Sequence, residues 1–220
     1  ELGDVVDLAM RCGPIAAAGT AVLTESGAFK ALTLDLCEQI GLPLPEPAAA
    51  TTAALRGAIP DFIPVSNPMD LTAQALVDPD LYRRTLEPLL ADDRFGAIVL
   101  GIIQTDIATS RLKFEPIIQA IRTLAPSKPV VFAGLDEGAP VPSEYLAELR
   151  ALGVAYFPSP DRAFRAIARL AAARPEAEAA GAPVTATLPH GGVIPEYEAK
   201  ALLAPLAIPF PTGGFARTPY

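Results

Sequence analysis

Residues 97–103 read AIVLGII, and residues 129–133 read PVVFA. Neither segment alternates polar with apolar side chains, as a strand with one wet face would. Strands of a parallel sheet that is covered by helices on both faces have this continuous apolar pattern, because neither face meets water. The two segments therefore predict a central, mostly parallel β-sheet.

Shorter β-like runs and helical patterns alternate on either side of these two segments. The predicted strands are Ala21–Thr24, a weaker one at Ile63–Val65, Ala97–Ile103, Pro129–Ala133 and Val154–Phe157. The predicted helices are an opening one with apolar spacing from Leu2 to Met10, then Gly27–Ile40, Pro79–Leu90, Arg111–Leu124, Ser143–Leu152 and Asp161–Ala173. This alternation implies right-handed βαβ crossovers, and it predicts an α/β doubly wound fold in three layers, flavodoxin-like or Rossmann-like.

The composition excludes several functional classes. Hydrophobic residues make up 51% of the 220 residues and charged residues 19%, which is typical of an ordered α/β protein. The net charge of −8 would repel a nucleic acid, and no cluster of Lys and Arg offsets it locally. No run approaches the ~20 apolar residues of a membrane helix, and the acidic start is no signal peptide, so we expect a cytoplasmic protein.

Nucleophilic and metal-ligating side chains are scarce. We interpret the two cysteines, Cys12 and Cys37, as reduced, buried small hydrophobes rather than redox groups. The single histidine, His190, lies in a Pro/Gly-rich stretch, where a surface position is more common than a catalytic one. Without it no Ser-His-Asp or Cys-His set can form, so hydrolase chemistry and a metal site are both disfavoured.

The composition changes after Ala173. Residues 174–183 read RPEAEAAGAP and are interpreted as a linker. Residues 184–220 contain a short helical pattern from Pro195 and Glu196 to near Leu206, but they are too few to form a domain. We therefore expect one domain at 1–173, a linker at 174–183, and the beginning of a second domain at 184–220.

The turn after the first predicted strand is the first candidate site, because ligands of an open α/β sheet bind beyond the carboxyl ends of its strands. There Ser26, Gly27 and Ala28 lead directly into a helix, whose free N–H groups suit a phosphate or carboxylate. The alternative interpretation is that Ser26 and Gly27 form only an N-cap and a tight bend, with no ligand. Glu25 would oppose an anion here, so we expect its side chain to turn away, with Lys30 as a candidate partner.

Two further loops carry polar side chains near the same edge. Asn67 and Asp70 lie in SNPMDLTAQ, residues 66–74, where an Asx-type turn is the alternative to a binding role. Gln104, Thr105 and Asp106 follow the AIVLGII strand directly, where Thr105 or Asp106 could equally cap the next helix.

Several stretches together resemble the nucleoside-diphosphate-forming (ADP-forming) acyl-CoA synthetases, relatives of succinyl-CoA synthetase. The resemblance covers residues 1–173 and is carried by residues 19–47, 51–73 and 86–103, most specifically by Leu55, Pro60 and the NPMDL of residues 67–71. The tail, PEYEAKALL at residues 195–203, is similar to the entry of that family's ATP-grasp domain.

The resemblance implies an acid–CoA ligase that interconverts acyl-CoA, ADP and phosphate with acid, CoA and ATP through a phosphohistidine. It implies that Ser26, Gly27 and Ala28 face the phosphate, and that Asn67, Asp70 and Gln104–Asp106 form substrate-side loops. CoA, ATP or ADP, and Mg²⁺ would serve the full-length enzyme, and this chain alone would bind none of them. Its partners would be CoA-binding, phosphohistidine and ATP-grasp domains, in a homo- or hetero-oligomer.

The sequence departs from that family in two respects. The phosphohistidine loop does not occur in the chain, so we expect the histidine elsewhere and the isolated chain to be inactive. Ala28 and Phe29 also stand where members often have a second glycine, and Glu25 stands where a small residue or an amide is common. The alternatives are a degenerate regulatory domain of a protein acetyltransferase and a stand-alone anion-binding or scaffolding domain.

Overall fold

The computed structural model describes residues 1–16, 18–173, 192–206, 209–211, 213 and 216. The chain divides into two units, residues 1–174 and 175–220, and each is described by itself. The expected linker, residues 174–183, and His190 lie outside the described residues.

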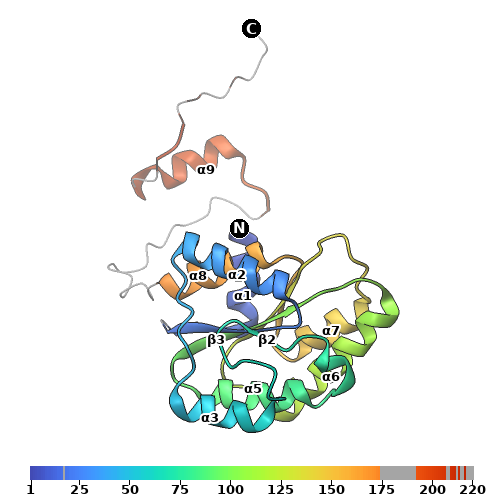
Figure 1. Ribbon diagram of the computed structural model, residues 1–220. Coiled ribbons are helices and arrows are strands. Elements are labelled where there is room, and N and C mark those ends of the chain that lie inside the picture. The colour runs from blue at the N-terminus through green and yellow to red at the C-terminus, as the bar shows by residue number, and fades with distance from the viewer. Residues whose placement is uncertain (17, 174–191, 207–208, 212, 214–215, 217–220) are drawn as a thin grey trace. The chain divides into compact units, whose positions relative to one another are not determined.

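Five parallel strands form the sheet of the first unit, as far as its residues are described (Figure 1). Their spatial order is β2-β1-β3-β4-β5. Their bounds are Gly19–Thr24 for β1, Met69–Asp70 for β2, Phe95–Ile102 for β3, Val130–Gly134 for β4 and Ala155–Phe157 for β5. The predicted parallel α/β sheet is confirmed, and every residue of β1, β3 and β4 is buried, as their continuous apolar sequences require.

Helices cover both faces of the sheet (Figure 1). One face packs against α1 (Leu2–Cys12), α2 (Gly27–Ile40) and α8 (Pro160–Ala172). The other packs against α3 (Ala49–Ala58), α5 (Leu81–Ala91), α6 (Ile107–Leu124) and α7 (Ser143–Ala151), and a short α4 spans Gln74–Val77. Alternate strand residues enter the two cores: Ile98 and Leu100 face the α5 side, whereas Ala97 and Val99 face the α2 side. The three-layer architecture is therefore confirmed.

The weakest predicted strand is wrong. Residues 63–65 form no strand, and the two-residue β2 lies four residues further on and pairs with Leu23 and Thr24. At this edge of β1, the Asn67 side chain makes the hydrogen bonds that the backbone of a neighbouring strand would make. The Val22 N–H donates to its Oδ1 at 2.9 Å, and its Nδ2 donates to the Thr20 carbonyl at 2.8 Å. Pro68 has no N–H, so the backbone ladder can begin only after it.

One helix differs from the prediction. The sequence pattern did not indicate α3, although its run of alanines has high helix propensity. The predicted helix at Gly27–Ile40 is α2, in which Phe29, Thr33 and Cys37 are buried and Leu36 and Ile40 pack partly buried against the same core. Leu32 is 49% exposed.

Both cysteines are free. Cys37 is buried on the sheet-facing side of α2, and burial raises the pKa of its thiol to about 12. Cys12 is half-buried at the end of α1, and its thiol donates to the Gly153 carbonyl at 3.2 Å. Neither environment favours a thiolate, which agrees with the structural role predicted for them.

In the second unit, helix α9 spans Glu196–Leu203 and a 3₁₀ turn follows at Ala204–Leu206. The predicted short helix ending near Leu206 is thus confirmed. Lys200 pairs with Glu196 one turn earlier, at 2.6 Å.

Candidate functional site

The strand order creates a topological switch point between β1 and β3. From β1 the chain moves outward to β2 on one side, and then crosses to β3 on the other. In doubly wound sheets, the loops at the carboxyl ends of two such strands diverge and leave a crevice that commonly binds ligands. The loop after β1 and the loop after β3 are therefore the candidate site.

The loop after β1 opens helix α2 with a neutral cap. Ser26 adopts an extended backbone and its Oγ accepts a hydrogen bond from the Phe29 N–H at 3.2 Å. Gly27 and Ala28 are both exposed, and as first-turn residues their N–H groups have no partner within the helix. Two backbone donors at the positive end of a helix dipole thus face outward, the arrangement that binds phosphate and carboxylate groups.

Close packing sets the position of this helix terminus. Phe29 is completely buried, and a methyl group added at Gly101 would lie only 2.2 Å from its ring, so α2 approaches β3 as closely as a glycine permits. The Thr24 hydroxyl also donates to the Gly101 carbonyl at 2.8 Å, and the Ser26 N–H donates to Thr24 Oγ1 at 3.2 Å. The turn is therefore tied to β3 on both sides of Glu25.

The Glu25 side chain lies at the switch point, between the loop after β1 and the loop after β3. Its Oε1 accepts from the Ile103 N–H at 3.1 Å and pairs with the Lys113 ammonium, and its Oε2 accepts from the Tyr82 hydroxyl at 3.4 Å. The side chain does turn toward other elements, as expected, but its cationic partner is Lys113 on α6 and not Lys30. Lys30 instead donates to Ser66 Oγ at 3.0 Å, on the β2 side of β1, whereas Glu25 lies on the β3 side.

The loop around β2 contributes one side chain to this edge and one to the interior. A methyl group built on Gly27 would lie 3.6 Å from Asp70 Oδ2, so this carboxylate neighbours the start of α2. Its Oδ1 accepts from the Thr72 N–H at 2.8 Å, which is the Asx turn considered above. Asn67 is buried and holds β1 through its amide, so it supports the loop from inside.

The residues after β3 have three different environments. Gln104 is buried, with Oε1 accepting from the Tyr156 hydroxyl at 3.2 Å and Nε2 lacking a partner among the described residues. Thr105 is exposed. Asp106 caps α6 by accepting from the Thr109 N–H at 3.0 Å, and hydrogen bonds from Thr109 lower the pKa of its carboxyl to about 2. Asp106 is therefore a helix cap, which was the alternative to a binding role for this residue.

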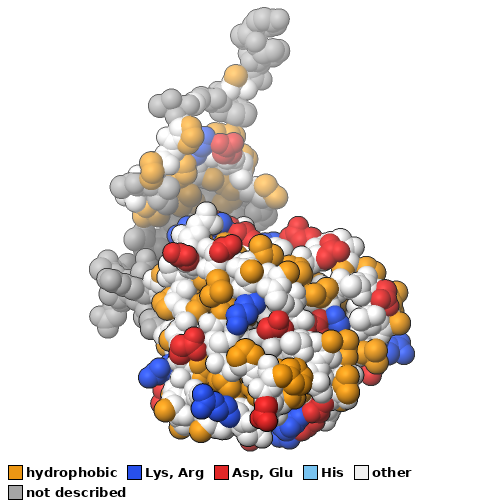
Figure 2. Space-filling view, viewed as in Figure 1, with side chains coloured by type: hydrophobic (Ala, Val, Ile, Leu, Met, Phe, Trp, Pro, Cys, Tyr) orange, Lys and Arg blue, Asp and Glu red, His pale blue; other side chains and the backbone are white. Residues whose placement is uncertain are grey.

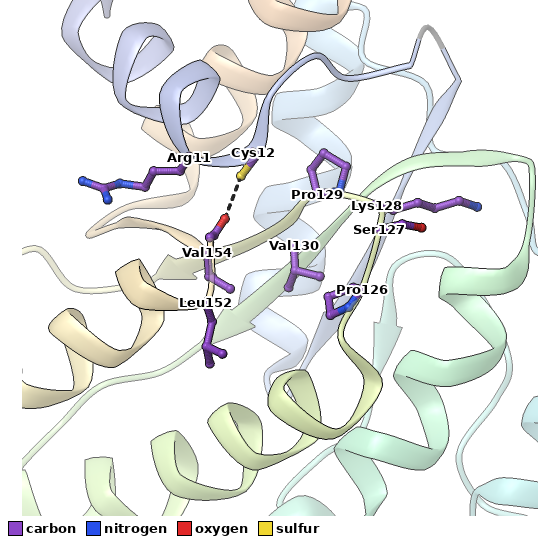
Figure 3. A pocket seen from close by; sticks show the side chains of 10 residues that line it. Arg11, Cys12, Pro126, Ser127, Lys128, Pro129, Val130, Leu152 and Val154 are labelled. Carbon is purple, nitrogen blue, oxygen red and sulfur yellow. Dashed lines mark hydrogen bonds between the residues drawn. The ribbon is translucent and has the colours of Figure 1, made fainter.

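Figure 3 shows a hollow at the opposite edge of the sheet, where β4 and β5 begin. Its volume is about 110 Å³, and its lining includes Arg11, Cys12 and Lys128. The Arg11 and Lys128 side chains extend to opposite sides of the hollow (Figure 3). Arg11 is paired with Asp7 at 2.7 Å, and Lys128 donates to the Asp92 carbonyl at 2.7 Å. Since both cations are already engaged, this hollow is a weaker anion site than the α2 terminus.

Within the described residues, no group of three or more His, Cys, Asp or Glu side chains could hold a metal ion. Acidic and basic side chains are interspersed over the face shown in Figure 2, so this face has no continuous basic patch. None of the described helices is long and apolar enough to cross a membrane.

Comparison with known proteins identifies the family of the chain. A family model described as "Ligase-CoA domain" matches residues 20–181, which include the candidate loops and all of the sheet except Gly19. The chain belongs to this family. Trans-feruloyl-CoA synthase from an unknown prokaryotic organism is 47% identical over 222 residues, which cover 98% of this chain and 31% of that protein. This Ligase-CoA chain thus spans about a third of the length of that relative.

Solved structures show the same fold. The apo form of dinucleotide-forming acetyl-coenzyme A synthetase 1 from Ca. Korarchaeum cryptofilum superposes with a TM-score of 0.63 at 24% identity, over 76% of this chain and 36% of that one. The same synthetase in complex with phosphate and ADP gives a TM-score of 0.62 at 25% identity, over 77% and 36% of the two chains. The resemblance to acyl-CoA synthetases that the sequence predicted is thereby confirmed.

Proposed function

We propose that this Ligase-CoA chain is one part of an ADP-forming acid–CoA ligase, in which it presents the N-terminus of α2 to a phosphate. The observation that carries the proposal is the pair of exposed, first-turn residues Gly27 and Ala28 behind the neutral cap Ser26. The phosphate would be carried by a histidine that lies outside these 220 residues. The similar synthetase solved with phosphate and ADP supports a nucleotide-linked reaction of this kind.

The geometry defines what the chain's own residues would do. The N–H groups of Gly27 and Ala28 would donate to phosphate oxygens, and the dipole of the fourteen-residue helix α2 would favour their negative charge. Because the donors belong to a packed helix, they are already oriented and need no rearrangement when charge develops on the phosphate. Asn67, Asp70 and Gln104–Asp106 would shape the neighbouring loops on the substrate side.

The acid is proposed to be an aromatic one of the hydroxycinnamate class. This follows from the 47% identity with a relative named trans-feruloyl-CoA synthase. CoA, ATP or ADP, and Mg²⁺ would be used by the full-length enzyme. The described residues form no cluster suited to a metal, so Mg²⁺ would be held by the nucleotide and by other domains.

The remaining parts of the enzyme would be CoA-binding, phosphohistidine and ATP-grasp domains, on the same chain or on a partner subunit. We propose residues 1–173 as the ligase domain, 174–183 as a linker and 184–220 as the beginning of an ATP-grasp domain. The share of the feruloyl-CoA relative that this chain covers, 31%, leaves room for all of them.

The regulatory alternative rests on Ala28, which stands where members of the family often have a second glycine. Ala28 is exposed in the first turn of α2, and its backbone N–H is as free of a partner within the helix as that of a glycine would be. No specific observation in the described residues therefore favours the alternative over the ligase.

The test is an assay of the full-length protein with ATP, CoA and ferulate, with release of ADP or AMP as the readout. ADP and feruloyl-CoA should form together, and omission of CoA or the acid should abolish net turnover. Benzoate and acetate serve as matched acids for the aromatic preference. Formation of AMP, or no product with any acid, would contradict the proposal.

A further inference from the structure

The described residues place a complete anion-binding set at the switch point, and the anion in it is Glu25. Oε1 receives the Ile103 N–H at 3.1 Å and the Lys113 ammonium, and Oε2 receives the Tyr82 hydroxyl at 3.4 Å. Lys113 also donates to the Ile103 carbonyl at 2.6 Å. The Lys113 and Glu25 side chains are only 7% and 4% exposed.

These donors are the kinds that would bind a free carboxylate or phosphate: one ammonium, one hydroxyl and one backbone N–H. Burial and the neighbouring Glu25 raise the pKa of Tyr82 well above 10, so its hydroxyl keeps its proton and remains a donor. The donors come from α5, the β3–α6 loop and α6, so the tertiary fold assembles them, and the acceptor comes from the loop after β1.

These donors and Glu25 lie at the switch point between β1 and β3. The crevice between β1 and β3 is where doubly wound sheets commonly bind their ligands, and here a side chain of the protein fills it. Glu25 lies between Thr24, which is bonded to β3, and Ser26, which caps α2. Anchoring the Glu25 carboxylate therefore also holds the first turn of α2 against the loop after β3.

We propose that Glu25 is a positioning residue that acts as a built-in anion: it occupies the Lys113–Tyr82–Ile103 site, keeps free anions out of the crevice and orients the α2 terminus for phosphate. The second part of this inference rests on the proposed ligase function. The first part does not, because it concerns only which anion fills the site.

The first experiment asks whether a free anion can replace the side chain. In the 220-residue chain, Glu25→Ala leaves Lys113 buried without its counter-ion, and formate is small enough to take the place of the carboxylate. Formate should raise the midpoint of thermal unfolding of E25A by about 3 °C or more, relative to the same concentration of chloride.

Three controls accompany this titration. The wild-type chain, E25A/K113M and the conservative E25Q should show no formate-specific rise, since the site is filled in the first and third and lacks its ammonium in the second. If E25A does not fold, formate added during refolding should recover folded protein, and chloride should not. An unchanged E25A midpoint, or no recovery on refolding, overturns the inference.

The second experiment measures positioning in the full-length protein, in the direction that consumes acyl-CoA, ADP and phosphate. E25Q keeps the shape of the side chain but loses its charge, so it should raise the KM for phosphate about tenfold and leave the KM for CoA unchanged. A general loss of folding would instead lower the active fraction and leave both KM values alone. Equal KM values for phosphate in E25Q and wild type overturn the positioning role.

The two experiments separate this inference from the proposed function. If the wild-type protein forms no ADP with any acid, the ligase proposal fails, and the formate titration still decides whether Glu25 fills an anion site. If the wild type is active and E25A ignores formate, the inference fails and the ligase proposal stands.

Discussion

Helices α2 and α6 both begin at the carboxyl edge of the sheet, after the neighbouring strands β1 and β3, and they cover its opposite faces. The N-terminal cap of one helix is charged, and that of the other is neutral. The cap of α6 is the carboxylate of Asp106, which accepts from the Thr109 N–H, whereas the cap of α2 is the neutral hydroxyl of Ser26. The nearest acidic side chain in sequence, Glu25, is turned to Lys113 instead.

The difference shows how two helix N-termini on one edge of a sheet can differ in what they offer to a ligand. At α6 the positive end of the dipole already has its own negative charge within hydrogen-bond distance. At α2 the cap is neutral, Gly27 and Ala28 are exposed, and the neighbouring Asp70 carboxylate accepts from the Thr72 N–H and not from the helix. An external phosphate therefore gains more at α2 than at α6.

The largest expected effect comes from removing the packing that places α2. Phe29→Ala should lower the free energy of unfolding by about 3–5 kcal/mol, because the ring is fully buried against Gly101 and Phe164. Phe62→Ala is the matched control, since that ring is 67% exposed and should change stability by less than about 0.5 kcal/mol. Denaturant unfolding measures both, and equal losses would show that α2 is not held by its aromatic contact.

Exchanging the two cap residues tests directly whether the neutral cap leaves the α2 terminus open to phosphate. Ser26→Asp keeps a good N-cap, so stability should change little, but it places a carboxylate where the phosphate is proposed to bind. We expect the KM for phosphate of the full-length protein to rise tenfold or more. Asp106→Ser is the matched variant, which should leave that KM unchanged. If the Asp106 variant were the one to lose phosphate affinity, the ligand terminus would be α6.

The smallest effect is the pH dependence of the α6 cap. Asp106 has a folded pKa of about 2 against an ordinary value of 3.8, because Thr109 donates to its charged form. A depressed pKa contributes stability above the ordinary value, and that contribution is lost as the pH falls through about 2. The stability difference between wild type and Asp106→Asn should therefore shrink between pH 4 and pH 2. Thermal unfolding at a series of pH values measures it, and a difference that grows in acid would exclude this role.

Much of the fold was predictable from local sequence. The apolar runs at residues 97–103 and 129–133 mark the interior of a parallel sheet, and β3 and β4 lie there within two residues of the predicted bounds. Helix α2 begins and ends where its Ser-Gly start and Gly41 stop predict. These features depend on neighbouring residues alone, so a single sequence is enough to show them.

Features that depend on distant residues were not predictable. The partner of Glu25 is 88 positions away, and nothing near Lys113 in the sequence distinguishes it from other helix lysines. The buried side of α2 also depends on a distant residue, since Phe29 packs in the space above Gly101.

The sequence by itself determined most of the elements, the sheet edge that carries the loops and the family, because strand burial, helix caps and motifs are local properties. Only the tertiary structure decided which charged side chains pair with each other and which one caps a helix. Strand order brings Ile103, Tyr82 and Lys113 around Glu25, and the cost of burying an unpaired carboxylate then holds it there and leaves the α2 terminus for the ligand.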